Sequence, residues 1–130
     1  MLDLKIIPGK RPDSMQKYQG GCHCQAVRYE VEIDVTQSIT CNCSICIKRG
    51  SILSFVAESQ FKLLKGAENL TDYQFNRNNI HNTFCKTCGI TSFASGTGPD
   101  GIKMIAVNVR CLDEIDLHSF SPVEVDGKLF

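Results

Sequence analysis

Seven of the eight cysteines in this 130-residue chain fall into three tight clusters. Two clusters are pairs and one is a triplet, with members Cys22 and Cys24, Cys85 and Cys88, and Cys41, Cys43 and Cys46. Four thiolates complete a tetrahedral zinc site, whereas three leave one position open for a further ligand. Two pairs and one triplet therefore predict one closed metal site and one open site, and the closed site must tie distant parts of the chain together.

Composition and charge argue against several classes of protein. The chain has 14 basic and 14 acidic residues and a formal net charge of zero, which disfavours a protein that binds nucleic acid by neutralising phosphates. No stretch approaches the ~20 apolar residues that span a bilayer, and residues 1–12 lack the apolar core of a secretory signal. We therefore expect a cytoplasmic protein without a membrane segment. Because thiols stay reduced in that compartment, clustered cysteines indicate metal or redox chemistry before disulfides.

The chain is expected to form a polar N-terminal arm over residues 1–19 and a single domain over residues 20–130. After Gly20 and Gly21, apolar residues alternate with charged ones from Val27 to Ile33, a pattern typical of a half-buried strand. Further strands are expected at 52–57, 61–64, 71–75, 83–84, 90–94 and 103–109, with breaks at 76–79 and 96–101. The nearly continuous apolar run in 104–109 predicts a central strand.

Helix is expected to be scarce. Ser44 could cap a helical turn over residues 45–48 that ends at Gly50, and residues 112–116 could form a second turn. No segment keeps helical periodicity over three turns. The sequence therefore predicts a mainly β fold with cysteine knuckles at the turns between strands.

The two pairs are best interpreted together as a closed, structural zinc site. A redox dithiol at Cys85 and Cys88 is disfavoured, because Gly89 and a strand-like segment follow where such a motif opens a helix. Spacing alone does not exclude an iron–sulfur cluster, although seven thiols do not fit one cluster cleanly. A zinc staple of this kind would contribute on the order of 10 kcal/mol to folding.

The triplet is interpreted as the open site. Three thiolates and one zinc ion sum to a single negative charge, and such a centre is suited to holding a thiol as thiolate at neutral pH. Lys48 and Arg49 follow directly and could offset this charge or meet a substrate carboxylate, although a solvated turn is the simpler reading of either residue alone. Cys111 is either a buried inert cysteine or a fourth ligand of the triplet. No motif supports a catalytic role for any of the three histidines, and we interpret them as ordinary surface residues: His23, His81 and His118.

Taken together, three segments resemble one known family: residues 21–30, 41–50 and 84–90. It is the glutathione-dependent formaldehyde-activating enzyme (GFA) family, also called the centromere-protein-V domain, and residues 108–112 resemble a further stretch of it. The resemblance implies a β-tent fold and two zinc ions. Carried over by position, the two pairs would hold the structural zinc, and the triplet would hold the second zinc at the active centre.

The resemblance also implies an activity. In the reaction that gives the family its name, glutathione and formaldehyde combine to S-hydroxymethylglutathione, formally the reverse of a carbon–sulfur lyase. Gln25 stands where the family usually has glycine, and Ile47 stands where a polar residue is common beside the open site. The leading hypothesis is a zinc enzyme that adds a small thiol to a small aldehyde. The alternatives are a non-catalytic zinc module for a thiol metabolite or protein partner, and cleavage of another thioether; the oligomeric state is left open.

Overall fold

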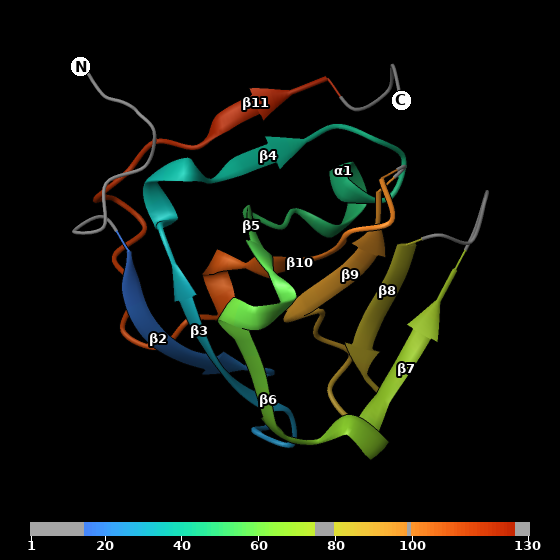
Figure 1. The fold of residues 1–130 in the computed structure, drawn as a ribbon. Helices are drawn as coiled ribbons and strands as arrows, with labels where there is room; N and C mark the ends of the chain where they lie inside the picture. The colour runs from blue at the N-terminus through green and yellow to red at the C-terminus, as the bar shows by residue number, and fades with distance from the viewer. Residues whose placement is uncertain (1–14, 75–79, 99, 127–130) are drawn as a thin grey trace.

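The computed structural model describes residues 15–74, 80–98 and 100–126 of the chain. In this part the protein is mainly β, as predicted, and its strands form two sheets (Figure 1). The expected breaks at 76–79 lie outside the described residues, as does most of the predicted N-terminal arm. Residues 16–19 of that arm lie in a strand.

The smaller sheet has three antiparallel strands in the order β2 (Gln16–Gly21), β3 (Arg28–Ile33) and β6 (Phe61–Lys65). The alternation that predicted β3 is confirmed, because Tyr29, Val31 and Ile33 are all at most 1% exposed. Burial of these side chains on one face of β3 fixes the register of the whole sheet, since a slip by one residue would turn them to solvent.

The larger sheet has seven strands in the order β11, β4, β5, β10, β9, β8 and β7. Their bounds are β4 (Ile39–Cys41), β5 (Leu53–Ala57), β7 (Leu70–Tyr73), β8 (Ile80–Cys85), β9 (Phe93–Thr97), β10 (Lys103–Asn108) and β11 (Val123–Val125). The predicted central strand is β10, which pairs with β5 on one side and β9 on the other. Strands β2, β4 and β11 were missed, because their sequences carry little apolar alternation.

The strand predicted at 90–94 begins later than expected, at Phe93. The carbonyl of Ile90 instead accepts a hydrogen bond of 3.0 Å from the backbone N–H of Cys85, and Gly89 N–H donates to the Cys85 carbonyl at 2.7 Å. Residues 85–90 therefore close on themselves as a tight turn. The strand predicted at 71–75 is β7, and its expected last residue lies outside the described part of the chain.

In the described part of the chain, helix is limited to α1 (Cys46–Arg49) and four short 3-10 turns: η2 (Val35–Gln37), η3 (Glu58–Gln60), η4 (Ala67–Asn69) and η5 (Val109–Cys111). Gly50 ends α1 in the left-handed region at φ 71°, as predicted, but the predicted cap by Ser44 is wrong, because Ile45 occupies the N-cap position without a side-chain hydrogen bond. The turn predicted at 112–116 forms earlier, as η5, because the Asn108 side chain accepts a hydrogen bond from Arg110 N–H and caps it there.

The hydrophobic core lies between the two sheets. Its centre is an aromatic cluster in which Tyr29, Phe61 and Phe93 have ring centroids 4.7–5.8 Å apart. The buried Tyr29 hydroxyl donates a 3.0 Å hydrogen bond to the carbonyl of Ser92. This contact joins the small sheet to the residue that precedes β9 in the large sheet. Across the described residues, no helix has the length and apolar character needed to cross a membrane.

Candidate metal centres

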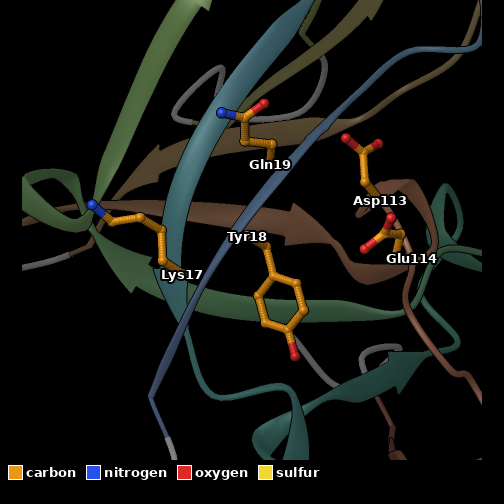
Figure 2. A pocket seen from close by; sticks show the side chains of 5 residues that line it. All are labelled: Lys17, Tyr18, Gln19, Asp113 and Glu114. Atoms are coloured by element: carbon orange, nitrogen blue, oxygen red, sulfur yellow. The ribbon is translucent and has the colours of Figure 1, made fainter.

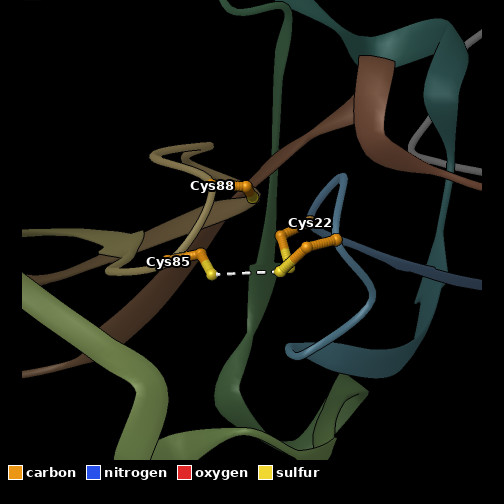
Figure 3. Close-up of side chains that lie close together, drawn as sticks. Cys22, Cys85 and Cys88 are labelled. Atoms are coloured by element: carbon orange, nitrogen blue, oxygen red, sulfur yellow. Dashed lines mark hydrogen bonds between the residues drawn. The ribbon is translucent and has the colours of Figure 1, made fainter.

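The two cysteine pairs meet in space. Cys22 and Cys24 lie in the turn between β2 and β3, and Cys85 and Cys88 lie in the turn between β8 and β9. The four Sγ atoms are all within 4.8 Å of one another, with 3.7 Å between Cys22 and Cys24 and 3.6 Å between Cys24 and Cys85. Figure 3 shows the side chains of the two turns converging on one point. We call this group the four-thiol cluster.

The geometry of the four-thiol cluster fits a tetrahedral metal ion. A tetrahedron with metal–sulfur distances of roughly 2.3 Å has sulfur–sulfur edges of about 3.8 Å, close to both printed separations. All eight cysteines lie in the described residues and none forms a disulfide. A cluster of four free thiols at this spacing can hold a metal ion, and the soft sulfur donors suit zinc.

Hydrogen-bond donors surround the cluster. The backbone N–H of Val27 donates to Cys22 Sγ at 3.3 Å, and the Asn69 amide donates to Cys85 Sγ at 3.1 Å. The same amide nitrogen lies 3.1 Å from Thr87 Oγ1. These donors stabilise sulfur in its charged form, which is the form that binds a metal. Asn69 was not predicted as a functional residue, because it belongs to no recognisable motif and its contact with Cys85 is made 16 residues away in the sequence.

A glycine allows Asn69 to reach the cluster. Gly66 precedes η4 with φ 100°, and a Cβ atom at this position would lie 2.3 Å from the carbonyl oxygen of Ala26. Only glycine permits both the left-handed backbone and this close approach. The segment from Gly66 to Asn69 can therefore lie directly against the turn that carries Cys22 and Cys24.

The thiols of the cluster differ in acidity. The backbone N–H of Cys88, followed by that of Thr87, outweighs desolvation and lowers the pKa of Cys85 to about 6. At Cys88 desolvation acts to raise the pKa, but hydrogen bonds from backbone N–H groups, chiefly those of Cys24 and Ile90, lower it overall. At Cys24 a hydrogen bond from the backbone N–H of Ala26 lowers the pKa, but desolvation and the thiols of Cys85 and Cys22 together raise it to about 11. The cluster therefore shares its protons unevenly, with negative charge favoured on the Cys85 side.

The cysteine triplet forms the second group. Cys41 ends β4, Cys43 follows in the connecting turn, and Cys46 begins α1; their Sγ atoms also lie within 4.8 Å of one another. All three residues are only partly buried, in contrast to Cys22 and Cys85. We call this group the three-thiol cluster. Within the described residues no fourth cysteine, histidine or carboxylate joins it.

The start of α1 sets the acidity of the three-thiol cluster. Although desolvation acts in the opposite direction, the Cys46 side chain and the backbone N–H groups of Cys46 and Ile45 lower the pKa of Cys43. Desolvation, followed by the hydrogen bond with Cys43, raises the pKa of Cys46 to about 12, and only Arg49 acts to lower it. One thiolate is thus favoured at the turn, and three would need a cation to compensate their charge.

The two basic residues after the triplet have different environments. Lys48 is exposed, as a solvated turn predicts. Arg49 is partly buried, and its Nη1 donates a 3.3 Å hydrogen bond to Oδ1 of Asn82 on β8. Asn82 is only 4% exposed and was not identified from the sequence.

The remaining candidates lie apart from the three-thiol cluster. The prediction that Cys111 could be its fourth ligand is not supported, because the Cys111 sulfur donates a long 3.9 Å contact to the carbonyl of Thr91 and belongs to neither cluster. Burial, followed by the nearby Cys22 and Cys88, raises the pKa of Cys111 to about 11. His23 and His118 are exposed, and His81 pairs with Asp72 at 2.6 Å. All three histidines therefore match the prediction of ordinary surface residues.

A surface pocket of about 370 Å³ lies on β2 and the turn after η5, lined by Lys17, Tyr18, Gln19, Asp113 and Glu114 (Figure 2). Its lining contains no cysteine. Asp113, at its rim, forms an ion pair with Arg28 at the start of β3. The pocket has no part in either thiol cluster.

The family model for the glutathione-dependent formaldehyde-activating enzyme matches residues 17–126, a range that contains both clusters. The chain belongs to the GFA family. A crystal structure of a Rhodobacter sphaeroides protein resembles this GFA protein with a TM-score of 0.73 and 34% sequence identity, over 82% of this chain and 97% of that one. The β-rich fold and the family predicted from the cysteine motifs are therefore confirmed.

Proposed function

We propose that this GFA protein is a zinc-dependent enzyme of the carbon–sulfur lyase type, which binds a small thiol such as glutathione at the three-thiol cluster and adds it to a small aldehyde such as formaldehyde. The observation that carries the proposal is the three-thiol cluster itself, which brings three sulfurs together and leaves the fourth position of a tetrahedral ion without a ligand among the described residues.

The chemistry follows from the donor set. Cys41, Cys43 and Cys46 would hold the zinc ion, which when bound would supply a position where an incoming thiol is kept as a nucleophilic thiolate at neutral pH. In the addition, the new carbon–sulfur bond forms as the thiol proton is transferred, in effect, to the aldehyde oxygen. Helix α1 would fix the position of Cys46 relative to the other two thiols. Because thiols add to formaldehyde readily without help, orientation is expected to supply much of the rate gain.

The four-thiol cluster is proposed to hold a second, structural zinc through Cys22, Cys24, Cys85 and Cys88. This site leaves no position for a substrate, so its role is to join the β2–β3 turn to the β8–β9 turn. Residues 20–130 would then fold as one metal-stapled domain, in a reducing compartment such as the cytoplasm that keeps the thiols available.

Metal analysis and exchange spectroscopy test the proposal. The purified wild type should contain two zinc ions per chain, Cys43→Ala should retain one, and Cys111→Ala, which removes a thiol outside both clusters, should retain two. Two-dimensional exchange spectroscopy on glutathione–formaldehyde mixtures should show faster exchange with wild type than with Cys43→Ala. A single zinc that is lost only with Cys22 or Cys85 would reject the open site. Two zinc ions without any acceleration at micromolar protein would favour a non-catalytic binding module.

A further inference from the structure

Two buried side-chain atoms in the described part of the chain have no hydrogen-bond partner, Nε of Arg49 and Oγ of Ser51. Buried polar groups in native proteins are almost always paired, so each such atom requires an explanation. The two residues are almost adjacent, and both follow directly on the last cysteine of the three-thiol cluster. Their common position points to a partner that binds beside this cluster.

Arg49 is held on the same side of α1 as a cysteine ligand. Cys46 and Arg49 are three residues apart in the helix, a spacing that places their Cβ atoms about 5–6 Å apart on one face. The Asn82 amide nitrogen donates at 3.1 Å to the carbonyl of Tyr73, which turns its oxygen toward Arg49. The guanidinium is thus fixed through Nη1, while its Nε is left without a partner.

Among the described residues no carboxylate pairs with Arg49, although its charge acts on the neighbouring Cys46 thiol. The ion pairs within residues 15–74, 80–98 and 100–126 join Arg28 to Asp113, His81 to Asp72, and Lys103 to Glu58. A partly buried guanidinium without a carboxylate partner is unusual, because charges taken out of water are normally paired. The group is therefore suited to an anion that comes from outside the chain.

Ser51 lies on the same side of the large sheet. Leu53 and Phe55 share one face of β5 by strand alternation, and the hydrogen bond of 2.7 Å from Val109 N–H to the Ile52 carbonyl extends this pattern toward Ser51. Phe55 pairs with Ala106 on β10, and Ala106 pairs with Ala94 on β9, so these three residues lie on one face of the sheet. Gly96 lies two residues after Ala94 on the same face, and it pairs with Ile80 on β8.

Asn82 follows Ile80 by two residues on β8, so it also lies on this face of the sheet. The Arg49 side chain lies against this face of the large sheet, because it donates a hydrogen bond to Asn82 there. Ser51 lies on the same face because it continues the alternation of β5. Both unpaired groups are therefore on the α1 side of the large sheet. Ser51 is only 5% exposed, so water does not readily satisfy its hydroxyl.

We propose that Arg49 recognises the carboxylate of a thiol ligand whose sulfur occupies the open position of the three-thiol cluster. This inference rests on the proposed function. The planar guanidinium matches a carboxylate in charge and in its paired donors, which an ammonium group does not. Ser51 supplies a further donor, and Asn82 acts as a positioning residue for Arg49. The ligand class is a small carboxylate-bearing thiol, and neutral or cationic thiols are expected to be disfavoured.

Thiol binding to the cobalt(II)-loaded protein tests this specificity, because the absorption of cobalt responds to sulfur ligands. The probes are 3-mercaptopropionate, which carries a carboxylate, and 2-mercaptoethanol, which is neutral and similar in size. The measured quantity is the ratio of their dissociation constants in each variant, so that the different acidities of the two thiols cancel between variants. Arg49→Gln is compared with Lys48→Gln, which removes the same charge from the exposed neighbouring residue.

A charge-assisted contact predicts that Arg49→Gln lowers the preference for 3-mercaptopropionate roughly ten- to a hundred-fold. Lys48→Gln should leave the ratio unchanged within about twofold, and Asn82→Ala should lower it partially, since it only releases the guanidinium. Arg49→Lys, which retains the charge without the fork, serves if Arg49→Gln loses metal or fails to fold, and it should also lower the ratio.

Two other outcomes overturn the inference, and they are distinguishable. If Arg49→Gln weakens both thiols equally, Arg49 only offsets the charge of the cluster and does not recognise a carboxylate. If neither thiol changes the cobalt spectrum of the wild type, no thiol enters the open position, and the proposed function fails together with the inference.

Discussion

The four-thiol and three-thiol clusters use the same ligand type but are built in different ways. The first joins two turns that are distant in sequence, and it includes Cys22 at 3% exposure and Cys85 at 0%. The second comes from one short segment, which runs from the end of β4 into the four-residue helix α1, and it is only partly buried. In Figure 1 the ends of β2 and β8 lie in the lower half of the molecule, whereas α1 lies in the upper half, below β4 and β11. This difference is what the proposed division of roles is built on, in which the four-thiol cluster supports the fold and the three-thiol cluster binds a ligand.

Removal of one thiol from each cluster should give the largest contrast. Cys85→Ala is expected to abolish stable folding, because metal binding at such a site contributes on the order of 10 kcal/mol, as much as the whole stability of a small domain. Cys43→Ala should stay folded, because its cluster closes only a local segment. Circular dichroism on heating and the zinc content of the purified variants would measure both effects. Equal loss of structure in the two variants would contradict the division of roles.

Acidification should release metal from the two clusters in a definite order. A thiol whose pKa is lowered keeps its thiolate, and hence its metal, until the pH falls through that lowered value. In the four-thiol cluster the pKa values of Cys85 and Cys88 are lowered, that of Cys85 to about 6, whereas the pKa of Cys24 is raised to about 11. In the three-thiol cluster the pKa of Cys43 is lowered, and burial raises the pKa of Cys46 to about 12. As the pH falls from 9 toward 5, the three-thiol cluster should lose its metal first. A chromogenic chelator would record two steps, with Cys43→Ala showing only the step at lower pH.

Loss of a donor to sulfur should weaken only the four-thiol cluster. Asn69→Ala removes the 3.1 Å hydrogen bond to Cys85 Sγ, and such supporting contacts typically change metal affinity about 10–100-fold. Chelator competition should therefore show weaker retention of one metal and unchanged retention of the other. Asn82→Ala, which alters an amide near α1 instead, is the matched control. An effect of Asn69→Ala on the three-thiol cluster would show that the two sites are coupled.

The smallest effect is expected at a surface ion pair close to the four-thiol cluster. Arg28 and Asp113 join the start of β3 to the turn after η5, and the Asp113 side chain is 47% exposed. Because exposed pairs contribute about 0–1 kcal/mol, Asp113→Asn should lower the free energy of unfolding by no more than this. Denaturant unfolding at two salt concentrations would measure it. A larger loss would indicate that this ion pair, and not only the metal, holds the first cysteine turn in place.

Much of the framework was predictable because its signals are local. The alternation in β3 and the apolar run of β10 predicted buried strands, and Gly50 predicted the end of α1. The spacing within each cysteine group predicted how the sulfurs would be shared. The errors occurred where competing local contacts decided the boundary, as in the capping of η5 by Asn108 and the turn closed by Ile90 before β9.

The sequence by itself determined the family, the mainly β fold and the division of seven cysteines into four and three, because thiol spacing within a few residues limits how sulfurs can surround one ion. Only the tertiary structure decided which polar groups face them. Asn69 reaches Cys85 from η4, and Asn82 on β8 fixes Arg49 beside the three-thiol cluster. Such contacts depend on the packing of strands distant in sequence, and no local pattern encodes them.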